Sequence, residues 1–360
     1  MKKIFLNAYD KVNFGDDLFV RYIANRYSNV KFFIWTDKNN KKTFSDVKNI
    51  KIIDKNSKFV SFLRRLRPSF ESRYKKMLED KCNAIVYIGG SIFIEYENWI
   101  NQINWLNYQA RNKFFVLGAN FGPYKSEEYK VSLNKVFENM EDVCFRDKYS
   151  YNIFLKNKKV RYAPDILFNQ FIPNLNTVKK QIFVSVINCI GRDGLGRLEQ
   201  YSQSYIKNII TLLKNKLNNG YSIVLSSFCK EEGDETSVSL IYECLKEYED
   251  SIIVCNYDGT NTNKILEYIA MSEYVIATRF HAMILGFAAR KPVLPIIYSD
   301  KTKNVLIDLN FDGQIIDLRN DGNWVKCEDI NLWKSLSINK IKELKSNSEL
   351  HFSRLDDLFR

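Results

Sequence analysis

The sequence is poor in the residues from which metal sites and redox centres are usually built. It has two histidines, His281 and His351, in 360 residues. A histidine-built metal site is therefore nearly excluded, and metal-assisted chemistry would need carboxylates alone. The seven cysteines are scattered and form no Cys-x-x-Cys pair. This pattern favours reduced core thiols over a disulfide framework or a zinc cluster.

Long apolar runs are also missing. No stretch approaches the ~18 uninterrupted apolar residues of a membrane-spanning helix. Residues 1–7 turn polar too soon for a signal peptide, and no repeat or low-complexity tail is present. We therefore expect a soluble, cytoplasmic protein. Its length suits two domains with full cores, because domains usually run ~100 to 200 residues.

Positive charge is abundant and uneven. The formal net charge is +12, which predicts anionic partners. Residues 51–81 hold ten Lys or Arg against four Asp or Glu, so this basic window supplies +6, half of the total. Nucleic acid ranks low among the partners, because no RNP-type, zinc-finger or helix-turn-helix signature accompanies the charge.

Within the basic window the apolar residues recur at helical spacing. The pattern predicts an amphipathic helix, and two interpretations stay open. The helix can lie on an anionic membrane surface, or its apolar face can pack on the core, with Pro68 kinking or ending it. The apolar stripe consists of Phe59, Phe62, Leu63, Leu66 and Phe70, and Arg64, Arg65 and Arg67 flank it.

Short apolar strands alternate with helical patterns along the whole chain. This order predicts an α/β protein with two Rossmann-like, doubly wound parallel-sheet domains that face a cleft. We expect an N-terminal domain over residues 1–170, a linker over 169–180 and a C-terminal domain over 180–334. Residues 335–360 are expected to form a terminal helix or helix pair that packs back on the N-terminal domain.

The most informative stretch is residues 272–301, which reads as strand, helix, strand. Ligands of such parallel units collect at the carboxyl ends of the strands, next to helix N-termini that favour anions. Thr278, Arg279 and His281 occupy that junction. Arg279 offers a planar fork of donors, and His281 can exchange a proton near neutral pH. We expect an anion site with an acid/base group beside it. The alternative is that Arg279 pairs with a neighbouring carboxylate and His281 satisfies a buried helix start.

Polar or glycine-rich turns follow two strands of the first half. After the strand at residues 4–6 comes Asn13-Phe-Gly-Asp-Asp17, where Gly15 allows a tight turn and Asp16 can cap the next helix. Spacing alone favours this capping role. In the functional interpretation Asn13 and the Gly15 backbone face a substrate, with Asp16 or Asp17 as a base. The strand at residues 84–88 ends in Gly89, Gly90 and Ser91, which allow a ligand close to the backbone.

The motifs together are similar to those of the polysaccharide pyruvyl transferase family, and the resemblance spans residues 3–305. The motifs that carry it, in chain order, are Asn13-x-Gly-Asp-Asp17, Gly89-Gly90-Ser91, Arg146-Asp147-x-x-Ser150, Pro164-Asp165, Arg279-x-His281 and Tyr298-x-x-Lys301. The chain departs from many members at Ala277, where they have Ser, and at Ser91, where they have a third Gly.

The resemblance implies a fold like that of GT-B glycosyltransferases and a reaction that uses phosphoenolpyruvate to place a pyruvate ketal across two hydroxyls of a sugar. It assigns Arg146, Arg279 and His281 to the donor site, with Lys301 as a weaker addition, and we add Thr278. Two arginines suit a donor with a carboxylate and a phosphate. His281 is then the best general acid and Asp16 or Asp17 the most plausible base. No metal or other cofactor is required.

We expect the acceptor to be a hexose of a polyprenyl-diphosphate-linked or polysaccharide precursor for a capsule, cell wall or exopolysaccharide. Its expected contacts are Asn13, Gly15, Gly89, Gly90 and Ser91. Such precursors lie at the inner face of the plasma membrane, where the basic window provides for peripheral docking. One alternative is a GT-B glycosyltransferase with a nucleotide-sugar donor, although residues 282–289 lack the acidic residue that often holds the donor ribose. The other is a non-catalytic polysaccharide-binding protein of the same fold.

Overall fold

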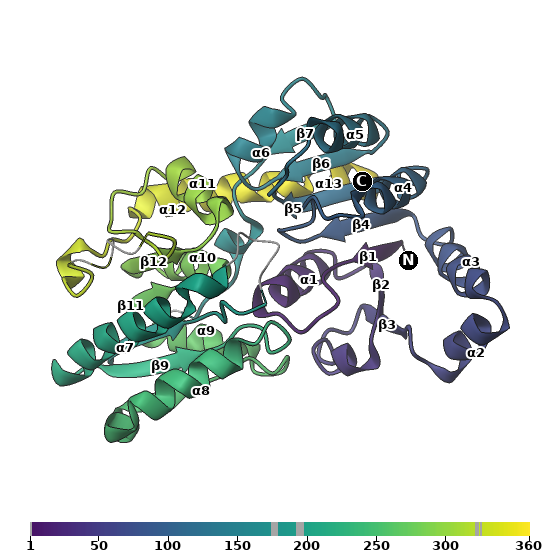
Figure 1. The fold of residues 1–360 in the computed structure, drawn as a ribbon. Helices are drawn as coiled ribbons and strands as arrows, with labels where there is room; N and C mark the ends of the chain where they lie inside the picture. Colours follow the sequence, from purple (N-terminus) through teal and green to yellow (C-terminus); the bar gives the residue numbers. More distant parts are fainter. Residues whose placement is uncertain (1, 174–178, 192–197, 321–323, 325) are drawn as a thin grey trace. The chain divides into compact units, whose positions relative to one another are not determined.

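The chain divides into two compact units in the computed structural model, which describes residues 2–173, 179–191, 198–320, 324 and 326–360. The first unit comprises residues 1–12, 16–166 and 348–360, and the second comprises residues 13–15 and 167–347. Figure 1 labels the helices and strands of both units. Within the predicted linker, residues 174–178 lie outside the described residues.

The first unit is built on a parallel sheet of seven strands in the order β3-β2-β1-β4-β5-β6-β7. The chain starts in the middle of this sheet and then crosses to the other side of β1, which is Rossmann-like winding. The strands are β1 (Lys3–Asn7), β2 (Lys31–Thr36), β3 (Ile50–Asp54), β4 (Ala84–Ile88), β5 (Phe114–Ala119), β6 (Asp142–Phe145) and β7 (Val160–Tyr162).

Helices cover both faces of this sheet. On one face, the apolar sides of α4 (Trp99–Gln109) and α5 (Glu127–Glu138) pack on alternate strand residues such as Phe5, Ile85 and Val116. The other helices of this unit are α1 (Phe14–Arg26), whose first two residues belong to the second unit, α2 (Lys58–Leu66), α3 (Pro68–Glu79) and α6 (Lys148–Ile153).

The C-terminal segment packs beside α1. It consists of the 3-10 turn Glu349–Phe352 and helix α13 (Ser353–Phe359). Phe352 stacks on Tyr22 at a centroid distance of 5.6 Å, and the Arg26 guanidinium donates to Asp356 over 2.9 Å. His351 is fully buried in this unit and its Nε2 lies 2.9 Å from the Pro164 carbonyl oxygen. These contacts explain why residues 348–360 belong to the first unit.

The second unit repeats the same winding with six parallel strands in the order β10-β9-β8-β11-β12-β13. One face of its sheet packs on α7 (Ser202–Asn218) and α8 (Asp234–Cys244) through a continuous apolar core. The strands are β8 (Lys179–Ser185), β9 (Ser222–Ser226), β10 (Ile252–Val254), β11 (Ser272–Ala277), β12 (Val293–Ile297) and β13 (Ile316–Asp317). The other helices are α9 (Thr262–Met271), α10 (Phe280–Ala288), α11 (Asp300–Asp308) and α12 (Ile338–Ser348).

Two doubly wound parallel sheets confirm the predicted fold class, while several local predictions need correction. Helix α1 begins at Phe14, so Asp16 lies inside its first turn and does not cap it. Asn13 precedes the helix, and its side-chain oxygen accepts the Gly15 N–H over 3.1 Å. The apolar stripe of the basic window spans two helices, because α2 ends at Leu66 and α3 begins at Pro68, where a missing N–H costs nothing. No helix of the described residues is long and apolar enough to cross a membrane.

Candidate functional site

The predicted site residues lie in loops that follow the central strands of each sheet. In the first unit the strand order reverses between β1 and β4, and in the second between β8 and β11. Ligands of open α/β sheets bind outside the carboxyl ends of the strands at such a reversal. Gly89 follows β4, and Thr278, Arg279 and His281 follow β11. The topology thus places these residues at the sheet edge where open α/β sheets generally bind ligands.

Arg279 is the centre of the cluster in the second unit. Its side chain is nearly buried, and its Nη1 and Nε donate to Glu232 and Asp234, each over 2.6 Å. Arg279 is therefore paired, as the alternative interpretation required, but by carboxylates 47 and 45 residues earlier in the chain. Burial opposes the charge, yet the two carboxylates outweigh it and raise the pKa of Arg279. The guanidinium is a permanently charged, fixed group.

Asp234 anchors this pair from inside the protein. It is fully buried at the start of α8. Its carboxylate also accepts the backbone N–H groups of Asn188, Phe228 and Cys229 over 3.3, 3.4 and 3.2 Å. These hydrogen bonds hold the buried carboxylate in position. Glu232 differs, because its side chain retains 26% exposure to solvent.

His281 lies against Gly15, which belongs to the same unit. A Cβ atom built on Gly15 would be 1.6 Å from Nδ1 of His281, so only a glycine leaves room for the imidazole ring. Phe14 fixes this turn, because its buried ring meets Phe228 at 4.6 Å and its N–H donates to the Phe228 carbonyl over 3.0 Å. The φ angle of Gly15 is not among the positive ones. Space for His281, and not the tight turn that we predicted, explains this glycine.

Thr278 helps to hold the loop that follows β11 in place. Its hydroxyl lies 2.9 Å from the phenol oxygen of Tyr205, which also accepts the Ile187 N–H over 3.3 Å. The Arg279 N–H donates to the Ser185 hydroxyl at the end of β8 over 3.2 Å. Thr278 is 1% exposed. Its role visible in this geometry is to hold the loop, and direct contact with a donor stays a prediction.

Arg146 is the corresponding cation of the first unit. It follows β6, is buried, and donates to Asp165 over 3.1 Å and to the Asn120 side-chain oxygen over 2.9 Å. A Cβ atom on Gly90 would be 2.3 Å from Nη2 of Arg146. The backbone at Gly90 thus lies directly against the guanidinium. Gly90 therefore makes room for Arg146, whereas a contact of Gly90 with the acceptor remains a prediction.

The carboxylate of Asp16 lies beside Gly89. The side-chain oxygen is 3.7 Å from the position of a Cβ on Gly89. Burial, and secondarily the negative charge of Asp16, raises the pKa of Tyr87 to about 12, so that phenol stays protonated at neutral pH. Asp17 is 5% exposed, whereas Asp16 is half-buried and the more accessible of the two predicted bases. Ser91 is exposed.

Lys301 lies in the first turn of α11, with its Nζ 6.0 Å from the Tyr298 ring centre. The motifs did not indicate Glu232, Asp234 or Asn120, nor the pairing of Asp165 with Arg146. Glu232, Asp234 and Asn120 carry no signal of their own, because each pairs with an arginine 26 to 47 residues away in the chain. Among the described residues no group of three or more His, Cys, Asp or Glu is arranged to hold a metal ion.

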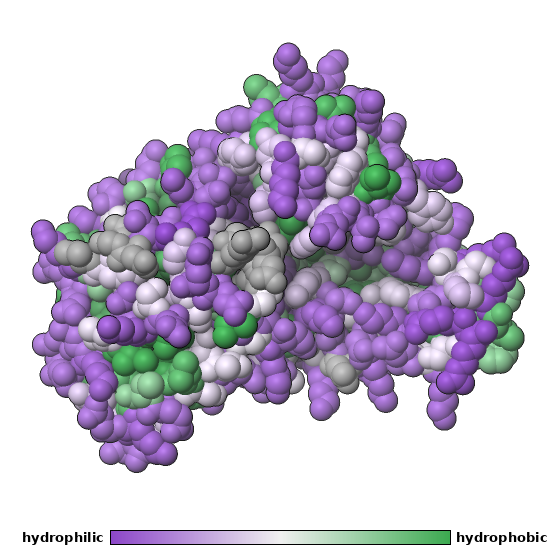
Figure 2. All heavy atoms as spheres, viewed as in Figure 1, coloured by the Kyte–Doolittle hydropathy of each residue, from purple (hydrophilic) through white to green (hydrophobic). Residues whose placement is uncertain are grey.

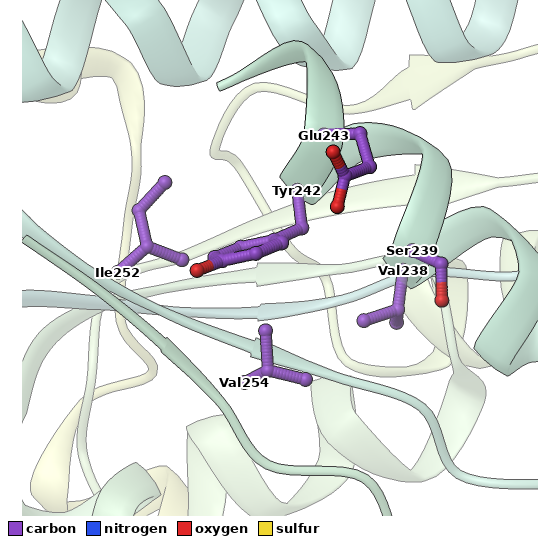
Figure 3. Close-up of a pocket in the computed structure, with 6 residues that line it drawn as sticks. All are labelled: Val238, Ser239, Tyr242, Glu243, Ile252 and Val254. Atoms are coloured by element: carbon purple, nitrogen blue, oxygen red, sulfur yellow. The ribbon is translucent and has the colours of Figure 1, made fainter. Parts of the chain in front are cut away.

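A hollow of about 400 Å³ lies elsewhere in the second unit, between α8 and the edge strand β10. Figure 3 shows Val238, Ser239, Tyr242 and Glu243 coming from the helix, and Ile252 and Val254 from the strand. Its lining contains no cationic side chain. The hollow therefore does not offer the anion-binding chemistry of the cluster around Arg279.

The chain is similar to known proteins in sequence and in fold. A family model described as polysaccharide pyruvyl transferase matches residues 13–300. The amylovoran biosynthesis protein AmsJ of Erwinia amylovora is 22% identical in an alignment 269 residues long that covers 68% of this chain and 65% of that protein. The chain thus spans about two thirds of the length of this relative.

Two solved structures are similar in fold at low sequence identity. The UDP-GlcNAc 2-epimerase from Neisseria meningitidis bound to UDP-GlcNAc has a TM-score of 0.61 and 11% identity, with coverage of 99% of this chain and 100% of that one. A glycosyltransferase from Rickettsia africae has a TM-score of 0.53 and 12% identity, with 99% of each chain covered. The neighbours confirm the GT-B-like fold, and the family match establishes that this chain belongs to the polysaccharide pyruvyl transferase family.

Proposed function

We propose that this protein is a ketal-forming transferase that takes its three-carbon unit from phosphoenolpyruvate. The observation that carries the proposal is Arg279, a buried and permanently charged guanidinium, two residues before a partly exposed His281 at the carboxyl end of β11. An anion-binding group beside a titratable group suits a donor that carries negative charge and must accept a proton.

The reaction joins phosphoenolpyruvate to two hydroxyls of one sugar. A proton is delivered to the methylene carbon, one hydroxyl oxygen bonds to the neighbouring carbon, the bond from that carbon to the phosphate oxygen breaks, and the second hydroxyl oxygen bonds in its place. The two hydroxyl protons end on the new methyl group and on phosphate. We assign His281 as the general acid and Asp16 or Asp17 as the base, with Arg279, Arg146 and Lys301 as donor contacts.

We propose a hexose of a cell-surface polysaccharide precursor as the acceptor, carried on a polyprenyl diphosphate at the inner face of the plasma membrane. The family match and the exopolysaccharide relative support this class of acceptor. Asn13, Gly15, Gly89, Gly90 and Ser91 are the proposed acceptor contacts. No metal or further cofactor takes part in this proposal.

The test is to incubate the purified protein with phosphoenolpyruvate and a panel of lipid-linked and synthetic galactosides and mannosides. Release of phosphate together with a pyruvate ketal on the sugar, identified by mass spectrometry and NMR, supports the proposal. His281→Ala is expected to lower turnover about 100-fold or more. Arg279→Lys is also expected to be costly, because an ammonium cannot reproduce bidentate contact. Near-normal rates in both variants would contradict the assignment.

A nucleotide-sugar glycosyltransferase is the second candidate, because the epimerase of similar fold was solved with UDP-GlcNAc. Against it, α10 (Phe280–Ala288) contains no acidic residue to hold a donor ribose. Ligand binding raises the thermal midpoint by mass action, so a thermal-shift screen separates the two candidates. A shift with phosphoenolpyruvate and none with UDP-sugars favours pyruvyl transfer, and the reverse result favours the second candidate.

A further inference from the structure

Helix α2 exposes its large apolar side chains to solvent. Phe59, Phe62 and Leu66 are 55%, 56% and 58% exposed, whereas Val60 is 1% exposed and packs inward. The three exposed residues are spaced i, i+3 and i+7, so they lie along one side of the helix. In the structure, Val60 therefore packs on the protein while Phe59, Phe62 and Leu66 face solvent. The sequence pattern alone did not decide which way the apolar residues face.

The helix is well fixed without these three side chains. The Ser57 hydroxyl caps its start by accepting the Val60 N–H over 3.3 Å. Arg64 ties α2 to α3 through two donations to the Glu71 carboxylate, over 2.6 and 2.8 Å. In Figure 1, α2 and α3 form a pair next to the edge strand β3 of the first unit. The apolar face is thus presented on an ordered element at the edge of that unit.

Cationic side chains accompany the apolar face. Lys58, Arg65 and Arg67 are exposed, and none has an ion-pair partner among the described residues. Arg64 differs, because Glu71 neutralises it. Figure 2 shows hydrophobic and strongly hydrophilic residues side by side on this part of the surface. We call Phe59, Phe62, Leu66, Lys58, Arg65 and Arg67 together the α2 docking face.

We propose that the α2 docking face binds the surface of an anionic lipid bilayer. Apolar side chains that dip below the headgroups, flanked by cations that stay among them, are typical of interfacial helices. A second copy of this chain fits less well. A symmetric contact would bring the unpaired cations of both copies together, and one nine-residue helix falls short of the ~800 Å² per partner of a stable interface.

This inference gives the proposed function its location, because a lipid-linked acceptor requires the protein at the membrane. The lipid binding itself can be measured without turnover. Vesicle binding with no pyruvyl transfer would leave the docking intact and count against the proposed function. Turnover on a soluble acceptor without vesicle binding would support the proposed function and count against the docking.

The experiment measures co-sedimentation of the full chain with vesicles of phosphatidylcholine and phosphatidylglycerol in equal parts. We expect binding at low salt and release as salt rises toward about 1 M, where the Debye length is only ~3 Å. Pure phosphatidylcholine vesicles are expected to bind far less. Equal binding to both vesicle types, or sedimentation without vesicles through self-association, would overturn the proposal.

Charge reversal tests the electrostatic part. Arg65→Glu with Arg67→Glu is expected to weaken vesicle binding by about 30-fold or more, from ~1 kcal/mol for each basic residue at the surface. The matched control is Lys156→Glu with Lys158→Glu, an exposed pair of the same spacing in the first unit, without an ion-pair partner among the described residues. The control is expected to bind within a fewfold of the wild type. Equal losses in both double variants would mean that only net charge matters and would overturn the assigned face.

The apolar part is tested with Phe62→Ser and Leu66→Ser, which leave the contact of Phe59 with Tyr74 intact. The double variant is expected to bind vesicles about tenfold or more weakly, because two large apolar side chains no longer become partly buried in the bilayer. Leu240→Ser with Ile307→Ser is the matched control, since these residues are 50% and 61% exposed on the second unit. Unchanged binding of the α2 variant would refute insertion of this face.

Discussion

Gly15→Ala offers a sharp test of the role of His281. Alanine normally stabilises a helix relative to glycine by about 1 kcal/mol, so helix propensity alone predicts a harmless or favourable change at this position in α1. The structure predicts otherwise. The new Cβ would lie 1.6 Å from Nδ1 of His281, whereas unstrained non-bonded contacts are about 3.5 Å or longer. One of the two groups must therefore move by roughly 2 Å.

The imidazole is the group expected to move. The buried Phe14 ring and its backbone hydrogen bond to Phe228 hold the first turn of α1, while His281 is only half-buried and can rotate. A misplacement of about 1 Å can cost 100-fold in rate, so we expect Gly15→Ala to lower kcat about 100-fold. The thermal midpoint is expected to stay within a few degrees of the wild type.

The assay is release of phosphate from phosphoenolpyruvate in the presence of a sugar acceptor, and the control is His281→Ala with Gly15→Ala in one chain. If Gly15→Ala acts only by displacing His281, the double variant is no slower than His281→Ala alone, because effects of residues that act together do not add. Wild-type turnover by Gly15→Ala, or a further large loss in the double variant, would refute the reasoning.

Two further predictions concern charges inside the units. The Glu232 carboxylate lies 2.6 Å from Arg279 and competes with an incoming anion for the guanidinium, which costs the anion about 1 kcal/mol of binding free energy after solvent screening. Glu232→Gln is therefore expected to bind phosphoenolpyruvate about five- to tenfold more tightly, as measured by calorimetry. Unchanged or weaker binding would contradict this. Burial lowers the pKa of His351 to about 3, below its unfolded value near 6.5. Between these values only the unfolded chain gains the proton, so stability falls as the pH drops below 6.5, by at most ~1.4 kcal/mol per pH unit. Thermal unfolding of His351→Gln from pH 7 to 5 is expected to show a smaller loss than the wild type, and identical pH profiles would contradict it.

The fold was predictable where periodicity and chain breakers agree. Residues 272–301 were predicted as strand, helix and strand, and β11, α10 and β12 follow that order because Pro292 separates the helix from the second strand. The strands β3, β7 and β13, which no sequence pattern indicated, have two to five residues and lie at sheet edges. Such strands depend on pairing with a neighbour more than on their own pattern. Four of the five residues of β3 (Ile50–Asp54) also lie inside the basic window, where the charged residues obscure the apolar pattern of a strand.

Of the candidate site, only the cations and the histidine were predictable from the sequence. Arg279 and His281 stand out because of their place directly after a strand. Their partners do not stand out. Asp234 begins a helix 45 residues earlier and reads as an ordinary first-turn acid, yet it is fully buried and accepts from Arg279. Only the pairing of β8, β9 and β11 in one sheet brings these segments together.

The glycines of the two motifs show why spacing alone could not assign their roles. Gly15 and Gly90 were predicted to serve a turn and the close approach of a ligand. In both cases the space of the missing Cβ is taken by a side chain of the same unit, the His281 ring in one and the Arg146 guanidinium in the other. Neither glycine has a positive φ, so the backbone itself would accept alanine. Each motif glycine therefore works together with one side chain. Gly15 leaves the space that the His281 ring occupies, and Gly90 leaves the space that the Arg146 guanidinium occupies at the end of the sheet.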